Sequence, residues 1–121
     1  MQLKVFFRTS RSFGRNPIDG VDARITLNSL LRSFNKDEIV VICDNTTFKQ
    51  YEWFAMRFPF VYRTYIGNCS SFRLALKLTD LHPADIYYFV EDDHLHLPEQ
   101  REWILAGLDL FDFVSLYDHP D

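Results

Sequence analysis

Residues 38–43, Glu-Ile-Val-Val-Ile-Cys, form an almost continuous apolar run that ends at Asp44. A strand with one face in water alternates apolar and polar residues, whereas a continuous apolar run is typical of a strand that is buried on both faces. Strands of that kind belong to parallel sheets that carry helices on both sides. This stretch therefore indicates an α/β fold.

Similar short apolar runs recur along the chain and alternate with segments of helical spacing. We expect strands at 3–8, 38–43, 60–66, 86–90 and 113–117, and helices at 23–34, 48–58, 70–81 and 98–110. Asp22 is placed to cap the first helix, and Pro98 to begin the last one. The alternation predicts one domain over residues 1–121, with a Rossmann-like, mainly parallel sheet and the strand order 3-2-1-4.

Composition excludes several classes of protein. The chain has 121 residues, 47% of them hydrophobic, and a net charge of -4, which argues against a general nucleic-acid binder. No apolar run reaches the ~20 residues of a membrane span, and the start of the chain does not resemble a signal peptide. We therefore expect a cytoplasmic protein in which Cys43 and Cys69 are reduced core thiols.

Polar residues follow the first, second and fourth predicted strands. In open parallel sheets, ligands bind beyond the carboxyl ends of the strands, where the strand order reverses. With the order 3-2-1-4 that point lies between the first and fourth strands. Arg8, Thr9 and Ser10 then stand on one side of the crevice and residues 91–93, Glu-Asp-Asp, on the other, with Asp44 nearby.

The acidic triplet is the sharpest of these features. Two carboxylates about 5 Å apart, at an effective dielectric constant near 20, repel each other by roughly 3 kcal/mol. Raised pKa values, exposure to solvent or a bound cation would relieve this repulsion, and carboxylate oxygens suit Mg²⁺ or Mn²⁺. The alternative is a solvated acidic turn before the next helix.

Arg73 is a second candidate. We place it in the first turn of the helix at 70–81, where a cation meets the positive end of the helix dipole. Together with Arg8 it could hold an anionic ligand. The alternative is an arginine that pairs with a neighbouring acid.

Four segments together resemble the GT-A-type glycosyltransferases, which use nucleotide-diphosphate sugars and a DXD-type metal motif. They are Phe7–Ser10, Cys43–Asn45, Asn68–Arg73 and Phe89–His94. The resemblance covers nearly the whole chain as the nucleotide-binding half of that fold. It rests on the order of the segments and their position at strand ends, since no single motif is decisive.

The resemblance implies roles for the strand-end residues. Arg8, Thr9, Ser10 and Asp44 would hold the base and ribose, and Arg73 would approach the diphosphate or the sugar. Glu91 and Asp92 would contact ribose, sugar or metal-bound water. Asp93, with Asp92 as a second candidate, would bind Mn²⁺ or Mg²⁺.

The resemblance also implies an activity, the transfer of a sugar from a nucleotide-diphosphate sugar to a glycan or another acceptor. A UDP-sugar is the first expectation for the donor. Family members usually have a longer C-terminal half that carries the acceptor site, so this chain is either a fragment or a minimal member. Asp118 and His119, just beyond the predicted fifth strand, are the candidates for a catalytic base near the ligand.

Other functions of this fold class are weighed by their motifs. A dinucleotide oxidoreductase needs a Gly-rich turn after the first strand, and a P-loop NTPase needs GxxxxGK[ST]; neither motif occurs. A receiver domain or aspartyl phosphatase would carry an acid where this chain has Arg8. A non-catalytic α/β nucleotide-binding or interaction domain stays open. So does a sugar-nucleotide nucleotidyltransferase, although the Gly-rich first loop with a Lys that it needs is missing.

Overall fold

The computed structural model describes residues 1–10 and 22–116, which form a four-stranded parallel sheet with helices. The strands are β1 (Leu3–Thr9), β2 (Ile39–Asp44), β3 (Phe60–Thr64) and β4 (Ile86–Glu91). The helices are α1 (Ala23–Leu30), the 3₁₀ turn η1 (Lys36–Glu38), α2 (Phe48–Ala55), α3 (Asn68–Leu78) and α4 (Gln100–Leu108). The strand order is β3-β2-β1-β4, and each neighbouring pair is parallel. The predicted fold class and strand order are confirmed.

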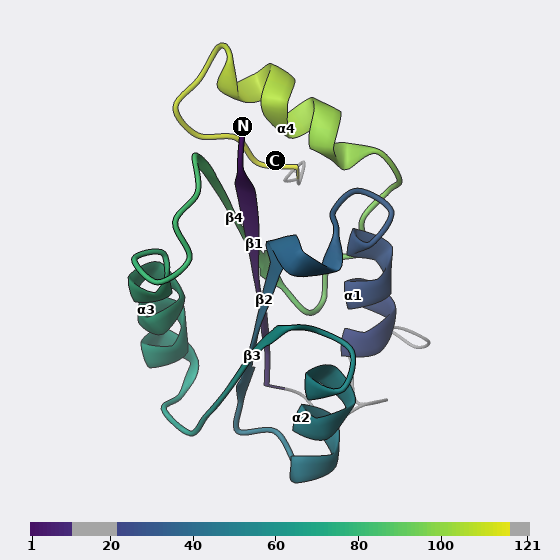
Figure 1. The fold of residues 1–121 in the computed structure, drawn as a ribbon, viewed down its shortest axis with the longest axis vertical. Coiled ribbons are helices and arrows are strands. Elements are labelled where there is room, and N and C mark those ends of the chain that lie inside the picture. Colours follow the sequence, from purple (N-terminus) through teal and green to yellow (C-terminus); the bar gives the residue numbers. More distant parts are fainter. Residues whose placement is uncertain (11–21, 117–121) are drawn as a thin grey trace, which may run out of the picture.

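The connections explain which helix covers which face. Figure 1 shows α1 and α2 on one side of the sheet and α3 on the other. The chain steps from β1 to β2 to β3 in one direction, and right-handed crossovers place α1 and α2 on the same face. The return from β3 to β4 runs in the opposite direction, so the same rule places α3 on the opposite face. This reversal makes the gap between β1 and β4 the switch point of the sheet.

The core has two halves, one on each face of the sheet. Along β1, Val5 and Phe7 face the α1 side and Phe6 faces the α3 side, and all three are fully buried. The α1 side is filled by residues such as Leu27 of α1 and Phe54 of α2. Every residue of β2 is buried, as its continuous apolar run predicts.

The predicted fifth strand is wrong for the residues that the structure describes. Residues 113–116 form irregular chain, and Tyr117 lies outside the described residues. Gly107 of α4 has no side chain, so Val114 packs closely against that helix. Leu116 packs against the core on the α1 side. Val114 and Leu116 are therefore partly buried without pairing with the sheet, whereas Phe113 is exposed.

Two helices begin at other residues than predicted. Helix α3 starts at Asn68, two residues early, because Gly67 adopts φ +88° at the N-cap, a conformation that glycine reaches without strain. Helix α4 starts at Gln100, after Glu99 in the left-handed region with φ +63°. Pro98 therefore precedes the helix and does not begin it.

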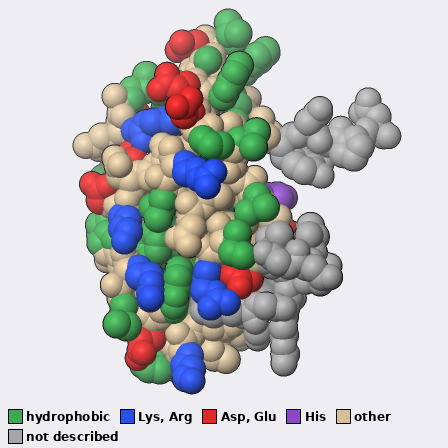
Figure 2. All heavy atoms as spheres, turned by 90° about the vertical axis from the view of Figure 1, so that its right-hand side faces the viewer, with side chains coloured by type: hydrophobic (Ala, Val, Ile, Leu, Met, Phe, Trp, Pro, Cys, Tyr) green, Lys and Arg blue, Asp and Glu red, His purple; other side chains and the backbone are tan. Residues whose placement is uncertain are grey.

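Helix α4 lies beyond the end of the sheet at which β1 begins, far from the carboxyl ends of the strands (Figure 1). Lys and Arg side chains on the α1 and α2 face are scattered among hydrophobic and acidic ones (Figure 2).

Both cysteines are free thiols, but only Cys43 is in the core, whereas Cys69 is exposed. Within the described residues, no helix has the length and apolarity needed to cross a membrane.

Candidate functional site

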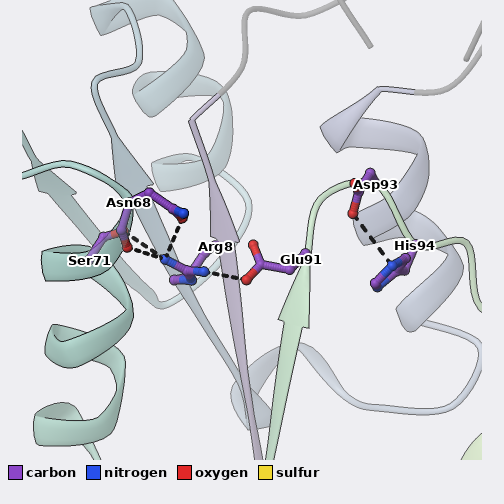
Figure 3. A network of polar contacts seen from close by, with 6 residues as sticks. All are labelled: Arg8, Asn68, Ser71, Glu91, Asp93 and His94. Carbon is purple, nitrogen blue, oxygen red and sulfur yellow. Dashed lines mark hydrogen bonds and ion pairs between the residues drawn. The ribbon is translucent and has the colours of Figure 1, made fainter. Parts of the chain in front are cut away.

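Arg8 connects three elements at the carboxyl end of β1. Its Nη1 donates to the Asn68 carbonyl oxygen at 2.7 Å and to the Ser71 hydroxyl at 2.8 Å, both at the start of α3. Its Nη2 donates to Glu91 Oε1 at the end of β4 (Figure 3). The ring of Phe72 lies 5.1 Å from the guanidinium carbon. The Arg8 side chain is only 11% exposed. Its hydrogen bonds link the start of α3 to the end of β4 across the switch point.

The second contact across the switch point joins Thr9 to Asp92. The Thr9 hydroxyl donates to Asp92 Oδ2 at 2.8 Å, and both residues are buried. The hydroxyl of Thr26, in α1, lies 2.6 Å from the Asp92 carbonyl oxygen and 2.7 Å from the Asp22 carbonyl oxygen. Asp22 caps α1 as predicted, because its carboxylate accepts from two backbone N–H groups of the first turn. The turn after β4 is therefore fixed to both β1 and α1.

Asp44 is buried at the end of β2 and fastens the turn that leads into α3. Its Oδ1 accepts from the Thr64 hydroxyl at 2.8 Å and from the Ile66 N–H at 2.9 Å. Its Oδ2 accepts from the Gly67 N–H at 3.1 Å and from the Asn45 amide at 3.2 Å. Four donors leave little acceptor capacity for a ligand, so the main role of this carboxylate is to shape the edge of the crevice.

Asp93 and His94 form the outer part of the acidic turn. Asp93 Oδ1 lies 3.7 Å from His94 Nε2, and both side chains are partly exposed (Figure 3). His96 is separate from them, since it is buried with its Nε2 2.6 Å from the Tyr88 hydroxyl. Burial lowers the pKa of His96 and raises the pKa of Tyr88 to about 12. Both groups are therefore neutral at pH 7.

The triplet avoids mutual repulsion by sending its carboxylates to different partners. Glu91 pairs with Arg8, Asp92 accepts from Thr9, and Asp93 lies beside His94. Glu91 is the last residue of β4, whereas Asp92 and Asp93 lie in the turn that follows it.

The crevice between these residues is small. It has a volume of about 20 Å³, and its lining includes Arg8, Ser10, Asp44, Glu91 and Asp92. That is room for about one water molecule, whereas pockets for small-molecule ligands span about 300–1,000 Å³. A nucleotide therefore does not fit inside the crevice, and the partly exposed side chains of its rim are the groups that a ligand can reach.

The structure brings together most of the predicted site residues, but neither Arg73 nor Asp93 lines the crevice. The early start of α3 makes Arg73 the sixth residue of the helix, in its second turn, where it is exposed and does not line the crevice. Asp118 and His119 lie outside the described residues. The fifth strand that was to place them on the ligand side is not formed within 113–116.

Three polar residues of this site are missing from the predicted set. Asn68 and Ser71 bind Arg8, and Thr26 contacts the turn after β4. Both Asn68 and Ser71 fall in the segment Asn68–Arg73 that carries part of the family resemblance, which was the available signal for them. Thr26 gives no such signal, because a threonine inside a helix usually has a local role.

The donor set fits a metal that is shared with a ligand, not one held by protein alone. Among residues 1–10 and 22–116, no three His, Cys, Asp or Glu side chains lie close enough together to hold a metal ion. Mg²⁺ and Mn²⁺, however, are often bound by one or two side chains, with the other positions filled by water and substrate phosphates. Asp93, with His94 beside it, provides such a partial set.

Comparison of the chain with family models, with curated protein sequences and with solved structures finds no match.

Proposed function

We propose that the chain is a metal-dependent glycosyltransferase, or the donor-binding domain of one, and that it binds a nucleotide-diphosphate sugar over the ends of β1 and β4. The observation that carries this proposal is the meeting of the acidic end of β4 with Arg8 and the start of α3 at the switch point. Open parallel sheets bind their ligands at this position.

Exposure indicates how the donor would lie. Asp92 and Asp44 are buried, so Ser10 and Glu91 form the accessible rim, and the partly exposed Asp93 lies in the turn that follows β4. The Glu91 side chain is 47% exposed and carries a carboxylate that can accept hydrogen bonds from ribose or sugar hydroxyls. Arg8 and Asp44 then act as positioning residues, because they hold the rim and α3 in place.

Charge explains why binding would require a divalent ion. Arg8 is the only Lys or Arg among the described residues that line the crevice, and its guanidinium is already occupied by Glu91, Asn68 and Ser71. The N–H groups in the first turn of α3 favour an anion only modestly. Asp93, with His94, would hold Mn²⁺ or Mg²⁺, which when bound would neutralise charge on the leaving diphosphate.

Calorimetric titration with UDP, GDP and CDP, each with and without Mn²⁺, tests the proposal. We expect binding of one nucleotide, UDP first, that requires Mn²⁺ and is lost in Asp93→Asn. Asp109→Asn is the matched control, because it removes an exposed carboxylate at the far end of α4. Equal binding by Asp93→Asn and the wild type, or binding that is indifferent to Mn²⁺, would contradict the proposal.

Sugar transfer needs an acceptor and, for inversion, a base within hydrogen-bond reach. Without an acceptor, we expect slow hydrolysis of the donor. Asp118 and His119 remain the proposed base candidates. Incubation with radiolabelled donors and mixed glycan acceptors measures both reactions, and rapid transfer by the Asp118→Asn, His119→Ala double variant would exclude these two residues.

One observation favours the second candidate, a non-catalytic interaction domain. The polar groups of the crevice satisfy one another, and only about 20 Å³ is left between them. That reading predicts no metal-dependent nucleotide binding, so the same titrations separate the two functions.

A further inference from the structure

Strand β4 has an edge that no other strand of the described chain covers. It is the last strand of the order β3-β2-β1-β4. The Ile86 N–H donates to the Gln2 carbonyl oxygen at 3.1 Å, toward β1. Backbone groups alternate in direction along a strand, so those of Tyr87, Phe89 and Glu91 point away from β1. An outward row of N–H and C=O groups at a sheet edge is a template for another strand.

A groove of about 880 Å³ runs along this edge. Its floor is β4, and its walls are the loop at 94–97, one side of α4, the segment 112–116 and Leu76 of α3. Residues 113–116, part of the predicted fifth strand, lie along its wall as irregular chain.

The walls of the groove expose large apolar side chains. Leu97 is 72% exposed and Phe113 is 92% exposed, and Leu95 and Leu76 are exposed as well. On the face that carries α1 and α2, hydrophobic side chains are also visible at the end of the molecule where α4 lies (Figure 2). Clustered apolar surface of this kind marks an interaction site, whereas single exposed leucines do not.

Shape and charge together select the occupant. The groove is bounded by α4 and by segment 112–116, and its volume of about 880 Å³ suits one extended chain between them. The charged side chains among its described lining residues are Asp85, Glu91 and Asp112, with no Lys or Arg. Glu91 is paired with Arg8, so the exposed Asp85 and Asp112 carry the negative charge that faces a ligand. An apolar strand with basic residues at its ends complements both the floor and the rim.

We propose that this groove binds an extended apolar segment of a partner polypeptide, flanked by Lys or Arg, which adds to the sheet as a fifth strand beside β4. The six residues of β4 span about 20 Å, so the bound segment has about six or seven residues. Its backbone pairs with Tyr87, Phe89 and Glu91, and its side chains contact the apolar walls on both faces of the sheet. This mode of recognition takes affinity from main-chain hydrogen bonds and specificity from the flanking pockets.

The test uses a labelled peptide, Lys-Val-Ile-Val-Ile-Val-Lys, with alternate backbone nitrogens methylated so that only one edge can pair. Fluorescence anisotropy should show saturable binding to the wild-type chain. Leu97→Asp and Phe113→Asp, which place a charge on the apolar walls, should each weaken binding at least about tenfold. Leu81→Asp is the matched control, since Leu81 is 70% exposed but lies outside the groove, and it should bind as the wild type does.

Two further peptides separate backbone pairing from general stickiness. Methylation of the remaining nitrogens should abolish binding, and replacement of both lysines by glutamate should weaken it. Equal binding of all three peptides, equal effects of Leu97→Asp and Leu81→Asp, or no binding at all would overturn the proposal. So would sedimentation that shows a dimer which Leu97→Asp dissociates, because a second copy would then occupy the groove.

Discussion

Replacement of Asp44 by alanine tests the claim that this carboxylate is mainly structural. The change leaves the N–H groups of Ile66 and Gly67 and the hydroxyl of Thr64 without their acceptor at the turn into α3. Asp44 is 3% exposed, so water replaces the carboxylate only in part. Asp44→Asn keeps one oxygen acceptor but presents an NH₂ group to donors on the other side.

The contacts set the size of the effect. A buried donor that loses its acceptor costs about 1–3 kcal/mol, and with partial rescue by water the three donors together cost about 3–5 kcal/mol. In a domain of this length 1 kcal/mol corresponds to about 4 °C, so the melting temperature should fall by about 12–20 °C. Asp44→Asn should lose about half as much free energy of unfolding.

Urea denaturation followed by circular dichroism measures these losses, with an unchanged m-value as the sign that the unfolded surface is the same. Asp80→Ala is the control, because Asp80 is exposed and should change the free energy of unfolding by no more than about 0.5 kcal/mol. If Asp44→Ala loses less than about 1 kcal/mol, the four hydrogen bonds do not hold the turn, and the reasoning fails.

Three other variants test separate parts of the fold. Burial lowers the pKa of His96, so the unfolded state binds more protons below about pH 6.5, and the free energy of unfolding decreases as the pH is lowered. His96→Gln should flatten this pH dependence in urea titrations between pH 7.5 and 5. An unchanged pH dependence would refute this role of His96. Arg101 donates two hydrogen bonds to Glu38, at 2.7 and 2.8 Å, so Arg101→Gln should cost about 1–3 kcal/mol at pH 7. Burial raises the pKa of Glu38 but the bonds from Arg101 lower it below its ordinary value, so this cost should shrink below about pH 4.5, and a cost independent of pH would contradict the pairing. Gly107→Ala should lower the melting temperature despite alanine's higher helix propensity, because the new Cβ would lie 2.7 Å from Val114 Cγ2. Adding Val114→Ala should restore the melting temperature. Additive losses of melting temperature in the double variant would argue against this contact.

The strands of the sheet could be predicted because their apolar runs leave little choice. Residues 38–43 have to be buried on both faces, and right-handed crossovers then limit the order of the strands. The run at 113–117, Phe-Val-Ser-Leu-Tyr, is also mostly apolar, but its residues 113–116 form irregular chain. A close contact between Val114 and the bare backbone of Gly107 buries part of it in another way, and no periodicity in the sequence reports such a contact.

The candidate site could be predicted as a place but not as a set of contacts. Strand ends meet at one edge of a parallel sheet, which brought Arg8 and Asp44 together with Glu91 and Asp92. The partners of each side chain depend on helix starts and rotamers. The conformation of Gly67 moved the start of α3 by two residues, and Arg73 consequently lies in the second turn and away from the crevice.

The position of β1 has a consequence for how the chain folds as it is synthesised. Among the described strands β1 emerges first, yet it pairs with β2 on one edge and with β4, more than eighty residues later, on the other. At about 5–20 residues per second, several seconds pass between the completion of β2 and the completion of β4. During that time the apolar edge of β1 beside the missing β4 is exposed to neighbouring chains. The nascent protein is therefore vulnerable to aggregation at the interior strand β1, and a chaperone that shields this strand would raise the yield of folded chain.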